Sequence, residues 1–171
     1  QWSAVDTAAA IGTGKIHAQE AVDAALSRMA ETNDTVNAVT VDLGVDAQQA
    51  ARQADDIVKS GVALGSLHGV PVTIKENVDQ AGQATTNGVP AFADVLAETD
   101  SPVVANMRKA GAIIIGRTNT PEFSLRWFTD NPLRGLTKNP WRDDITPGGS
   151  SGGAASAVAL GIGAIAHGND L

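Results

Sequence analysis

The chain has 171 residues, 43% of them hydrophobic and 18% charged, with a net charge of −7. This length suffices for one ordinary domain with a core, and no window approaches the roughly 18 consecutive apolar residues of a membrane span. The twelve Lys and Arg are scattered rather than clustered, which argues against a nucleic-acid surface.

Cysteine is absent from the chain, which excludes disulfides, thiolate nucleophiles and zinc–sulfur sites. The three histidines, His17, His68 and His167, lack the spacing of metal ligands, so we expect no metal and no cofactor. A chain without cysteine is compatible with a reducing cytoplasm, where we expect the protein to act.

Residues 1–62 are predicted to form an N-terminal helical arm that packs over a larger core. Ser3 is expected to cap the first helix, and Asn33 and Asp34 are expected to end the second. The expected elements are helices over 3–11, 18–31 and 45–60 and a strand over 36–41.

From about residue 63 onward, short apolar runs alternate with helical segments. Ala112 to Ile115 is continuous and largely β-branched, which is typical of a strand buried on both faces. The other expected elements are apolar runs over 70–74 and 163–166 and helices over 101–110 and 151–160. Strands that alternate with helices indicate a layered α/β core.

Two long turn-rich segments, 79–98 and 118–149, stand out, because loops of this length inside a compact domain usually carry function. The second ends in the glycine-rich loop Thr146–Gly153, in which Ser150 or Ser151 is a candidate nucleophile. Two other loop types are rich in glycine. The nucleophile elbow of α/β-hydrolases needs an apolar strand before it, and a phosphate-binding P-loop needs a lysine after its glycines; this loop has neither. A tightly packed helix entry is the structural alternative.

A serine nucleophile needs a base, and Lys75 at the end of the expected strand 70–74 is the best candidate. Burial disfavours the ammonium form and lowers the pKa of a lysine, which makes a neutral amine available as a base. The alternative is an ordinary surface lysine at a strand end. Composition and periodicity leave both interpretations open.

Four motifs occur in order: Leu67–Asn77, Gly111–Glu122, Asn139–Trp141 and Pro147–Gly153. Together they resemble the amidase signature family, and the likeness covers about residue 65 to the last residue. The resemblance implies a mixed central sheet covered by helices, with residues 63–171 forming the N-terminal part of the core.

The resemblance also implies a Ser–cis-Ser–Lys triad. Lys75 matches the general base, and Ser150 matches the bridging serine on a cis peptide bond that relays a proton to the nucleophile. Ser151 is expected to support the loop, and Asp170 to order the glycine segment. The nucleophilic serine matches a position three residues past Leu171, whose backbone amide is expected at one end of the oxyanion hole. The chain would then be the N-terminal portion of a longer enzyme.

The segment from Thr118 to Arg134 matches the part of the family that runs past the scissile carbonyl. Its candidates for the pocket wall are Phe123, Ser124, Leu125, Arg126 and Trp127, for which loop packing is the alternative. Arg126 is further expected to pair with a substrate carboxylate.

The resemblance implies hydrolysis of a carboxamide through an acyl-enzyme. Two alternatives stay open: a glutaminase or amidotransferase subunit that works on misacylated tRNA, and an inactive amidase fragment. The expected partners are a small amide substrate and the remainder of the same enzyme, with a homodimer left open. We expect no direct contact with nucleic acid or membrane.

Overall fold

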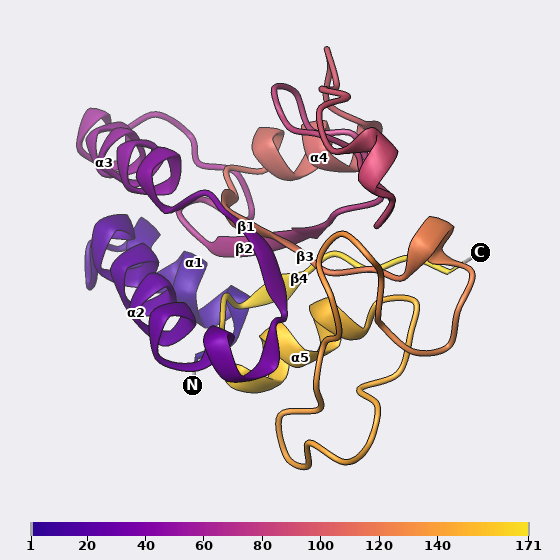
Figure 1. Cartoon of the computed structure of the whole chain (residues 1–171). Coiled ribbons are helices and arrows are strands. Elements are labelled where there is room, and N and C mark those ends of the chain that lie inside the picture. The colour runs from indigo at the N-terminus through magenta and orange to yellow at the C-terminus, as the bar shows by residue number, and fades with distance from the viewer. Residues whose placement is uncertain (1, 171) are drawn as a thin grey trace.

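The structure, a computed structural model, describes residues 2–170 (Figure 1). Its centre is a mixed sheet with the strand order β1-β3-β2-β4, in which β1 is antiparallel to β3 while β3, β2 and β4 are parallel. The strands are β1 (Val39–Asp42), β2 (Pro71–Lys75), β3 (Ile113–Thr118) and β4 (Ile165–Ala166). This mixed α/β sheet confirms the fold class expected from the sequence.

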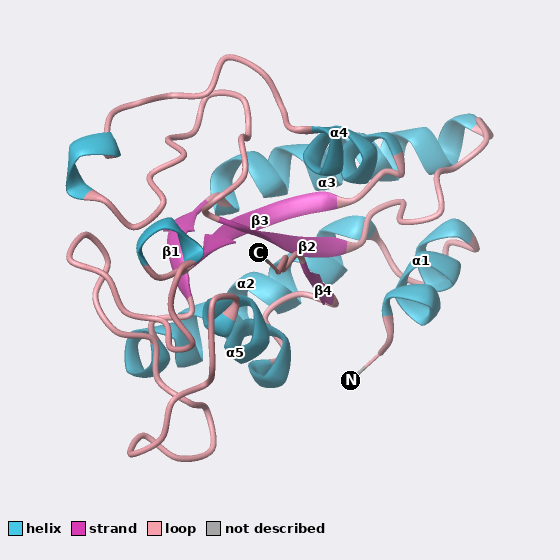
Figure 2. Cartoon of the chain, turned by 90° about the vertical axis from the view of Figure 1, so that its right-hand side faces the viewer, coloured by secondary structure: helices cyan, strands magenta, loops and turns pink. Residues whose placement is uncertain are grey.

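Helices pack on both faces of this sheet, with α4 on one side and α5 on the other (Figure 2). The helices are α1 (Ala4–Gly12), α2 (Ala18–Val36), α3 (Gly44–Ser60), α4 (Pro102–Lys109) and α5 (Gly152–Leu160). One hydrophobic cluster joins α2, α3 and α5 to Ile113 and Ile115, and a second joins Val104 of α4 to Val72 and Ile74. Successive side chains of a strand point to opposite faces of the sheet, so β2 and β3 together contribute to the hydrophobic clusters on both faces.

Helix α2 is longer than predicted, because it continues through Asn33 and Asp34 to Val36. Asn33 does not break the helix, because its side chain bonds to backbone that follows the helix. Its Oδ1 accepts the backbone N–H of Ala38 at 3.0 Å and that of Val39 at 2.8 Å. The helix ends instead at Asn37, which adopts a left-handed conformation with φ 56°. The predicted strand 36–41 is correspondingly displaced and starts at Val39.

The residues predicted as a helical arm are closely integrated with the rest of the chain. Strand β1 lies within 1–62 and pairs with β3, and the larger hydrophobic cluster contains residues from both sides of position 62. The boundary at residue 62 stays a prediction, but the arm supplies one strand of the sheet as well as helices that cover it.

The parallel strands β2 and β3 end side by side, with Lys75 paired to Thr118. Every residue of both strands is buried. The segments 79–98 and 118–149 follow from these two ends, and the yellow segment after β4 runs to the same side of the molecule (Figure 1). The carboxyl ends of parallel strands are the usual place for a ligand site in an open α/β sheet, so the fold directs attention to this edge.

Candidate active site

Lys75 is fully buried at the last position of β2. Its Nζ donates to Ser150 Oγ at 2.8 Å and to Asn169 Oδ1 at 2.9 Å. Burial lowers the pKa of Lys75 to about 8, against an opposing influence of the Asp170 carboxylate. The interpretation of Lys75 as a surface lysine is therefore wrong, and the structure brings it together with the loop serine named from the sequence.

Ser150 follows a cis peptide bond between Gly149 and Ser150, the geometry that the family resemblance implied. Gly149 is pressed against another loop: a Cβ here would lie 2.6 Å from the carbonyl oxygen of Arg126 and 2.7 Å from the backbone nitrogen of Phe128. No side chain fits in that space, so the site needs glycine before Ser150.

The glycine-rich loop is further held by Thr129, a fully buried residue of the long segment 118–149. Its Oγ1 donates to the carbonyl of Gly148 and accepts the backbone N–H of Gly152, both at 3.0 Å. These two bonds flank Ser150 and fix the loop at the start of α5. Sequence reasoning missed Thr129, which lies outside the motifs.

Ser151 makes its contacts with the chain end rather than with Lys75. Its Oγ donates to the carbonyl of Asn169 at 3.1 Å and accepts the Asn169 N–H at 3.2 Å. This pair of bonds attaches the segment after β4 to the glycine-rich loop. Leu171, expected to supply an oxyanion amide, lies outside the described residues.

Two asparagines that sequence reasoning missed complete the surroundings of the lysine. Asn169 Oδ1, besides accepting from Lys75, accepts from Asn77 Nδ2 at 3.1 Å. Asn77 Nδ2 also donates to Ser124 Oγ at 3.0 Å. Asn77 ends the motif Leu67–Asn77, and Asn169 precedes Asp170, which the sequence analysis named; their amide side chains were the available signal.

The predicted wall divides into two parts. Ser124 is buried and joined to the lysine through Asn77, whereas Phe123, Leu125 and Trp127 are exposed. Phe123 and Ser124 both have positive φ, 50° and 60°, a conformation that is uncommon outside glycine and clusters at functional sites. The unusual backbone thus includes Ser124, which hydrogen bonds link to Lys75 through Asn77 and Asn169.

Two wall residues have partners of their own. Arg126 forms an ion pair with Glu122 at 3.1 Å, so its guanidinium already has a carboxylate partner within the segment. Phe123 contacts Phe92 of the other long segment edge to face, with ring centroids 6.1 Å apart and an angle of 81°. An aromatic pair therefore joins the two long segments beside the buried Ser124.

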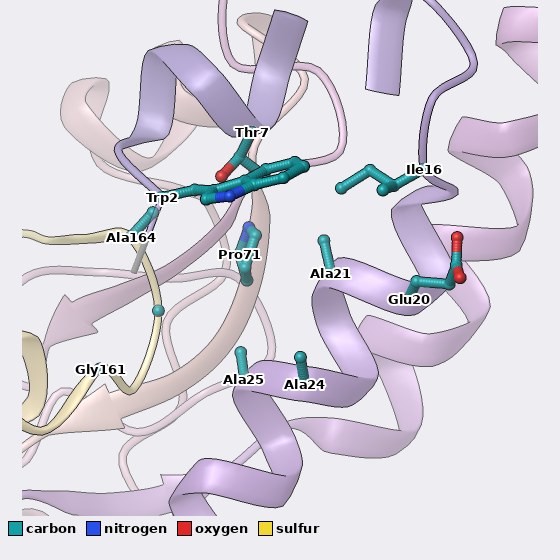
Figure 3. A pocket seen from close by; sticks show the side chains of 11 residues that line it. Trp2, Thr7, Ile16, Glu20, Ala21, Ala24, Ala25, Pro71, Gly161 and Ala164 are labelled. Carbon is teal, nitrogen blue, oxygen red and sulfur yellow. The ribbon is translucent and has the colours of Figure 1, made fainter. Parts of the chain in front are cut away.

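A separate hollow of about 330 Å³ lies at the other end of β2 (Figure 3). The Trp2 indole lies between Thr7 and Pro71 in this hollow, and Ala164 borders it. Pro71 begins β2 and Lys75 ends it, which places the two about 13 Å apart along the strand. Apart from Thr7 and Glu20 the lining of the hollow is apolar, and it contains none of the polar groups gathered around Lys75.

Residues 2–170 contain no group of three or more His, Cys, Asp or Glu side chains arranged to hold a metal ion. Among the helices of the same residues, none is both long and apolar enough to cross a membrane. The chemistry available at the end of β2 is that of a buried amine, a serine hydroxyl and two carboxamides.

The model of the Amidase family matches residues 20–171. An indoleacetamide hydrolase of Bradyrhizobium diazoefficiens is 64% identical over 171 residues, which is 100% of this chain and 33% of that protein. A subunit of the glutamyl-tRNA(Gln) amidotransferase of Endomicrobium trichonymphae is 37% identical over 160 residues, or 94% of this chain and 33% of that protein.

A solved structure of a bacterial aryl acylamidase from the amidase signature enzymes has a TM-score of 0.90 and 30% identity to this chain. The likeness covers 95% of this chain and 34% of that one. The chain thus spans about a third of the length of the relatives it matches.

Proposed function

The chain belongs to the amidase signature family, and from that premise we propose that the enzyme of which it forms part hydrolyses a carboxamide through a Ser–cis-Ser–Lys triad. The observation that carries the proposal is the contact between the buried Lys75 and Ser150, at 2.8 Å. A lysine with a pKa of about 8 has an appreciable neutral fraction near physiological pH, as a general base requires.

In the proposed reaction, neutral Lys75 accepts the hydroxyl proton of Ser150. Ser150 in turn takes the proton of the nucleophilic serine, for which the family resemblance gives a position after Leu171. That serine forms a bond to the amide carbonyl carbon, and backbone N–H groups stabilise the oxyanion. The relay returns the proton to the leaving ammonia or amine, and water then hydrolyses the acyl-enzyme.

We propose as substrate class the primary amides of flat, aromatic acyl groups, of which indole-3-acetamide is the representative. Two observations support this choice: the 64% identity to an indoleacetamide hydrolase, and the Phe92–Phe123 pair beside the site. Aromatic rings favour edge-to-face and offset contacts with other rings, so this pair offers an apolar surface for an aryl group.

The test is ammonia release from indole-3-acetamide by the full-length enzyme. Replacement of the base, Lys75→Ala, should lower kcat by at least about 10²–10⁴-fold, the usual contribution of general acid–base catalysis. Lys75→Arg should be equally inactive, because a guanidinium stays protonated. Lys59→Ala is the control, since that exposed lysine pairs with Asp56 on the surface of α3. Near-normal turnover by Lys75→Ala would contradict the proposed base.

The second candidate is an amidotransferase component that releases ammonia from glutamine for misacylated tRNA, and it is favoured by the likeness to the glutamyl-tRNA(Gln) amidotransferase. The two candidates differ in their need for partners. Release from indole-3-acetamide by the isolated enzyme supports the stand-alone amidase. Release from glutamine alone, and only in a multi-protein complex, would support the amidotransferase.

The cytoplasmic location and the homodimer expected from the sequence stay proposals of the same kind. Fractionation of cells that make the enzyme tests the first, and light scattering of the purified full-length enzyme tests the second. We propose no direct contact with nucleic acid for the stand-alone amidase.

A further inference from the structure

A continuous chain of hydrogen bonds leads from the buried lysine to the wall of the site. Asn169 Oδ1 accepts from Lys75 Nζ at 2.9 Å and from Asn77 Nδ2 at 3.1 Å. Asn77 Nδ2 continues to Ser124 Oγ at 3.0 Å, and Ser124 Oγ lies 3.0 Å from Thr120 Oγ1. Three segments far apart in the sequence are therefore connected, through the carboxamide oxygen of Asn169 and the NH₂ group of Asn77.

The orientation of both amides follows from the lysine. A protonated lysine only donates hydrogen bonds, so Asn169 must turn its oxygen, and not its NH₂ group, toward Nζ. Asn77 reaches the same oxygen, so it must present its own NH₂ group there. The oxygen of Asn169 is thus the shared acceptor for the two donors.

The charge of this acceptor matters because it lies within hydrogen-bond distance of the base. A carboxamide fixes the position of Nζ with a neutral dipole. A carboxylate of the same shape would accept the same bonds but would favour the ammonium form, typically raising the pKa of the amine by about one to three units. The residue at 169 can therefore hold the lysine in place without keeping it charged.

Other titratable groups near Lys75 are few among the described residues. On the segment after β4, the Asp170 carboxylate raises the pKa of Lys75, and burial together with the Lys75 charge lowers the pKa of His167. Next to Lys75 in sequence, Glu76 is paired with Arg134 at 3.0 Å. Helix α5, packed against this face, contains no titratable side chain. The remaining ionisable groups on β3 and in the segment from Thr118 to Arg134 are Arg117, Glu122, Arg126 and Asp130.

We propose that Asn169 and Asn77 are positioning residues that hold Lys75 Nζ against Ser150 through a neutral acceptor, so that the lysine can act as a base near neutral pH. This inference rests on the proposed amide hydrolysis. Asn169 supplies the shared oxygen, and Asn77 orients that oxygen while joining it to the wall at Ser124.

The test uses the full-length enzyme and the variants Asn169→Asp and Asn169→Ala. With Asn169→Asp, the acidic limb of the pH profile of kcat/KM should move upward by at least about one pH unit, and turnover should recover at high pH. Asn169→Ala should lower kcat about 10-fold, because Nζ loses its second anchor, without that upward movement. The control is Asn106→Asp, an exposed position on α4 across the sheet from α5, which should leave the profile unchanged.

A second measurement reports on the lysine without turnover. The pH titration of the Lys75 Cε chemical shift, followed by NMR in full-length enzyme with ¹³C-labelled lysine, reports the protonation of the buried amine without a reagent that has to reach it. In Asn169→Asp this curve should move in the same direction and by a similar amount as the activity profile. Asn77→Leu should lower kcat for the amide, and its titration curve should lie closer to wild type than that of Asn169→Asp.

An Asn169→Asp enzyme whose two curves both coincide with wild type would overturn the positioning role. An Asn169→Ala enzyme with normal kcat would do the same. Failure of the proposed function has a different signature, because the wild-type enzyme would then release no ammonia from any primary amide while the titration curve of Lys75 still responded to Asn169→Asp.

Discussion

At the scale of single residues, the site depends on a lysine that the fold keeps out of water. Lys75 lies where β2 ends, is fully buried, and has only a hydroxyl and a carboxamide as side-chain hydrogen-bond partners among the described residues. Burial penalises its charged form more than the Asp170 carboxylate restores it. A buried amine of this kind is suited to accept a proton rather than to form an ion pair.

This environment predicts the pH dependence of the full-length enzyme. Lys75 is charged below a pH of about 8 and neutral above it, so kcat/KM for an amide should rise with pH and level off above about 8. A profile measured from about pH 6 to pH 10 at constant ionic strength checks the midpoint. A rate that falls as pH increases through this range would contradict the role of Lys75 as the base.

The sequence was sufficient to name Lys75 and Ser150 because the motifs that contain them resemble those of the amidase signature family. Composition alone left the environment of Lys75 and the choice between Ser150 and Ser151 open. It was not sufficient to name the bridge between Asn77 and Asn169, which lie 92 positions apart. Their contact depends on where β2 and the segment after β4 end in space. No pattern of spacing in the sequence around either asparagine specifies that the two side chains meet.

At the scale of elements, local propensity mispredicted the end of a helix where a side chain forms hydrogen bonds to the element that follows. Asn33 resembles a helix breaker in sequence, yet it lies within α2 and its side chain accepts the first backbone N–H groups of the following turn and strand. The apolar strands were easier to predict, because β2 and β3 are buried on both faces and are rich in β-branched residues.

The close packing of the first turn of α5 against the backbone beside the sheet gives a prediction about stability at the scale of elements. A Cβ on Gly153 would lie 2.5 Å from the backbone nitrogen of Asn119 and 2.8 Å from the carbonyl oxygen of Ala38. Backbone cannot give way as a flexible side chain does, so Gly153→Ala should lower the free energy of unfolding by about 1–3 kcal/mol. Urea denaturation of the full-length enzyme measures the change.

Gly12 in α1 is the matched control for this substitution. It is also a helical glycine, but a Cβ there meets only a leucine methyl group, Leu64 Cδ1, at 3.4 Å. Gly12→Ala should therefore be neutral or stabilising by up to about 1 kcal/mol, because alanine favours helix. Equal losses of stability in the two variants would show that tight packing of α5 is not the cause.

The aromatic contact between the two long segments gives an element-scale prediction about specificity. Removing one ring of the Phe92–Phe123 pair, as in Phe92→Ala, should lower kcat/KM for indole-3-acetamide about 10-fold relative to that for butyramide, since only the aryl substrate uses the ring surface. Trp141→Ala, an exposed aromatic elsewhere in segment 118–149, should change neither ratio nor rate. An equal loss for both amides would assign Phe92 to loop packing alone.

At the scale of the whole molecule, a buried carboxylate joins four segments behind the site. Glu76 follows Lys75 and is fully buried. Its carboxylate accepts from Thr40 of β1 at 2.7 Å, from Thr86 of segment 79–98, and from Arg134 of segment 118–149 at 3.0 Å. The strand that carries the base and both long segments are thus held by the same side chain.

This arrangement makes Arg134 important for the stability of the full-length enzyme. Arg134→Met leaves a buried carboxylate without its cation, which should lower the free energy of unfolding by about 2–4 kcal/mol. This value lies between those for exposed and for fully buried ion pairs, because the Arg134 side chain is partly exposed. Adding Glu76→Gln to Arg134→Met should restore part of that loss, since the remaining side chain is then neutral.

The exposed pair between Arg142 and Asp144 is the control, because both side chains are mostly in solvent. Arg142→Met should change the free energy of unfolding by no more than about 0.5 kcal/mol. If Arg134→Met were equally harmless, the two threonines would suffice to hold Glu76, and the long segments would have to be fixed by other contacts. A large loss confined to Arg134→Met would instead show that the stability of the fold around β2 depends on a charge pair formed between segments distant in sequence.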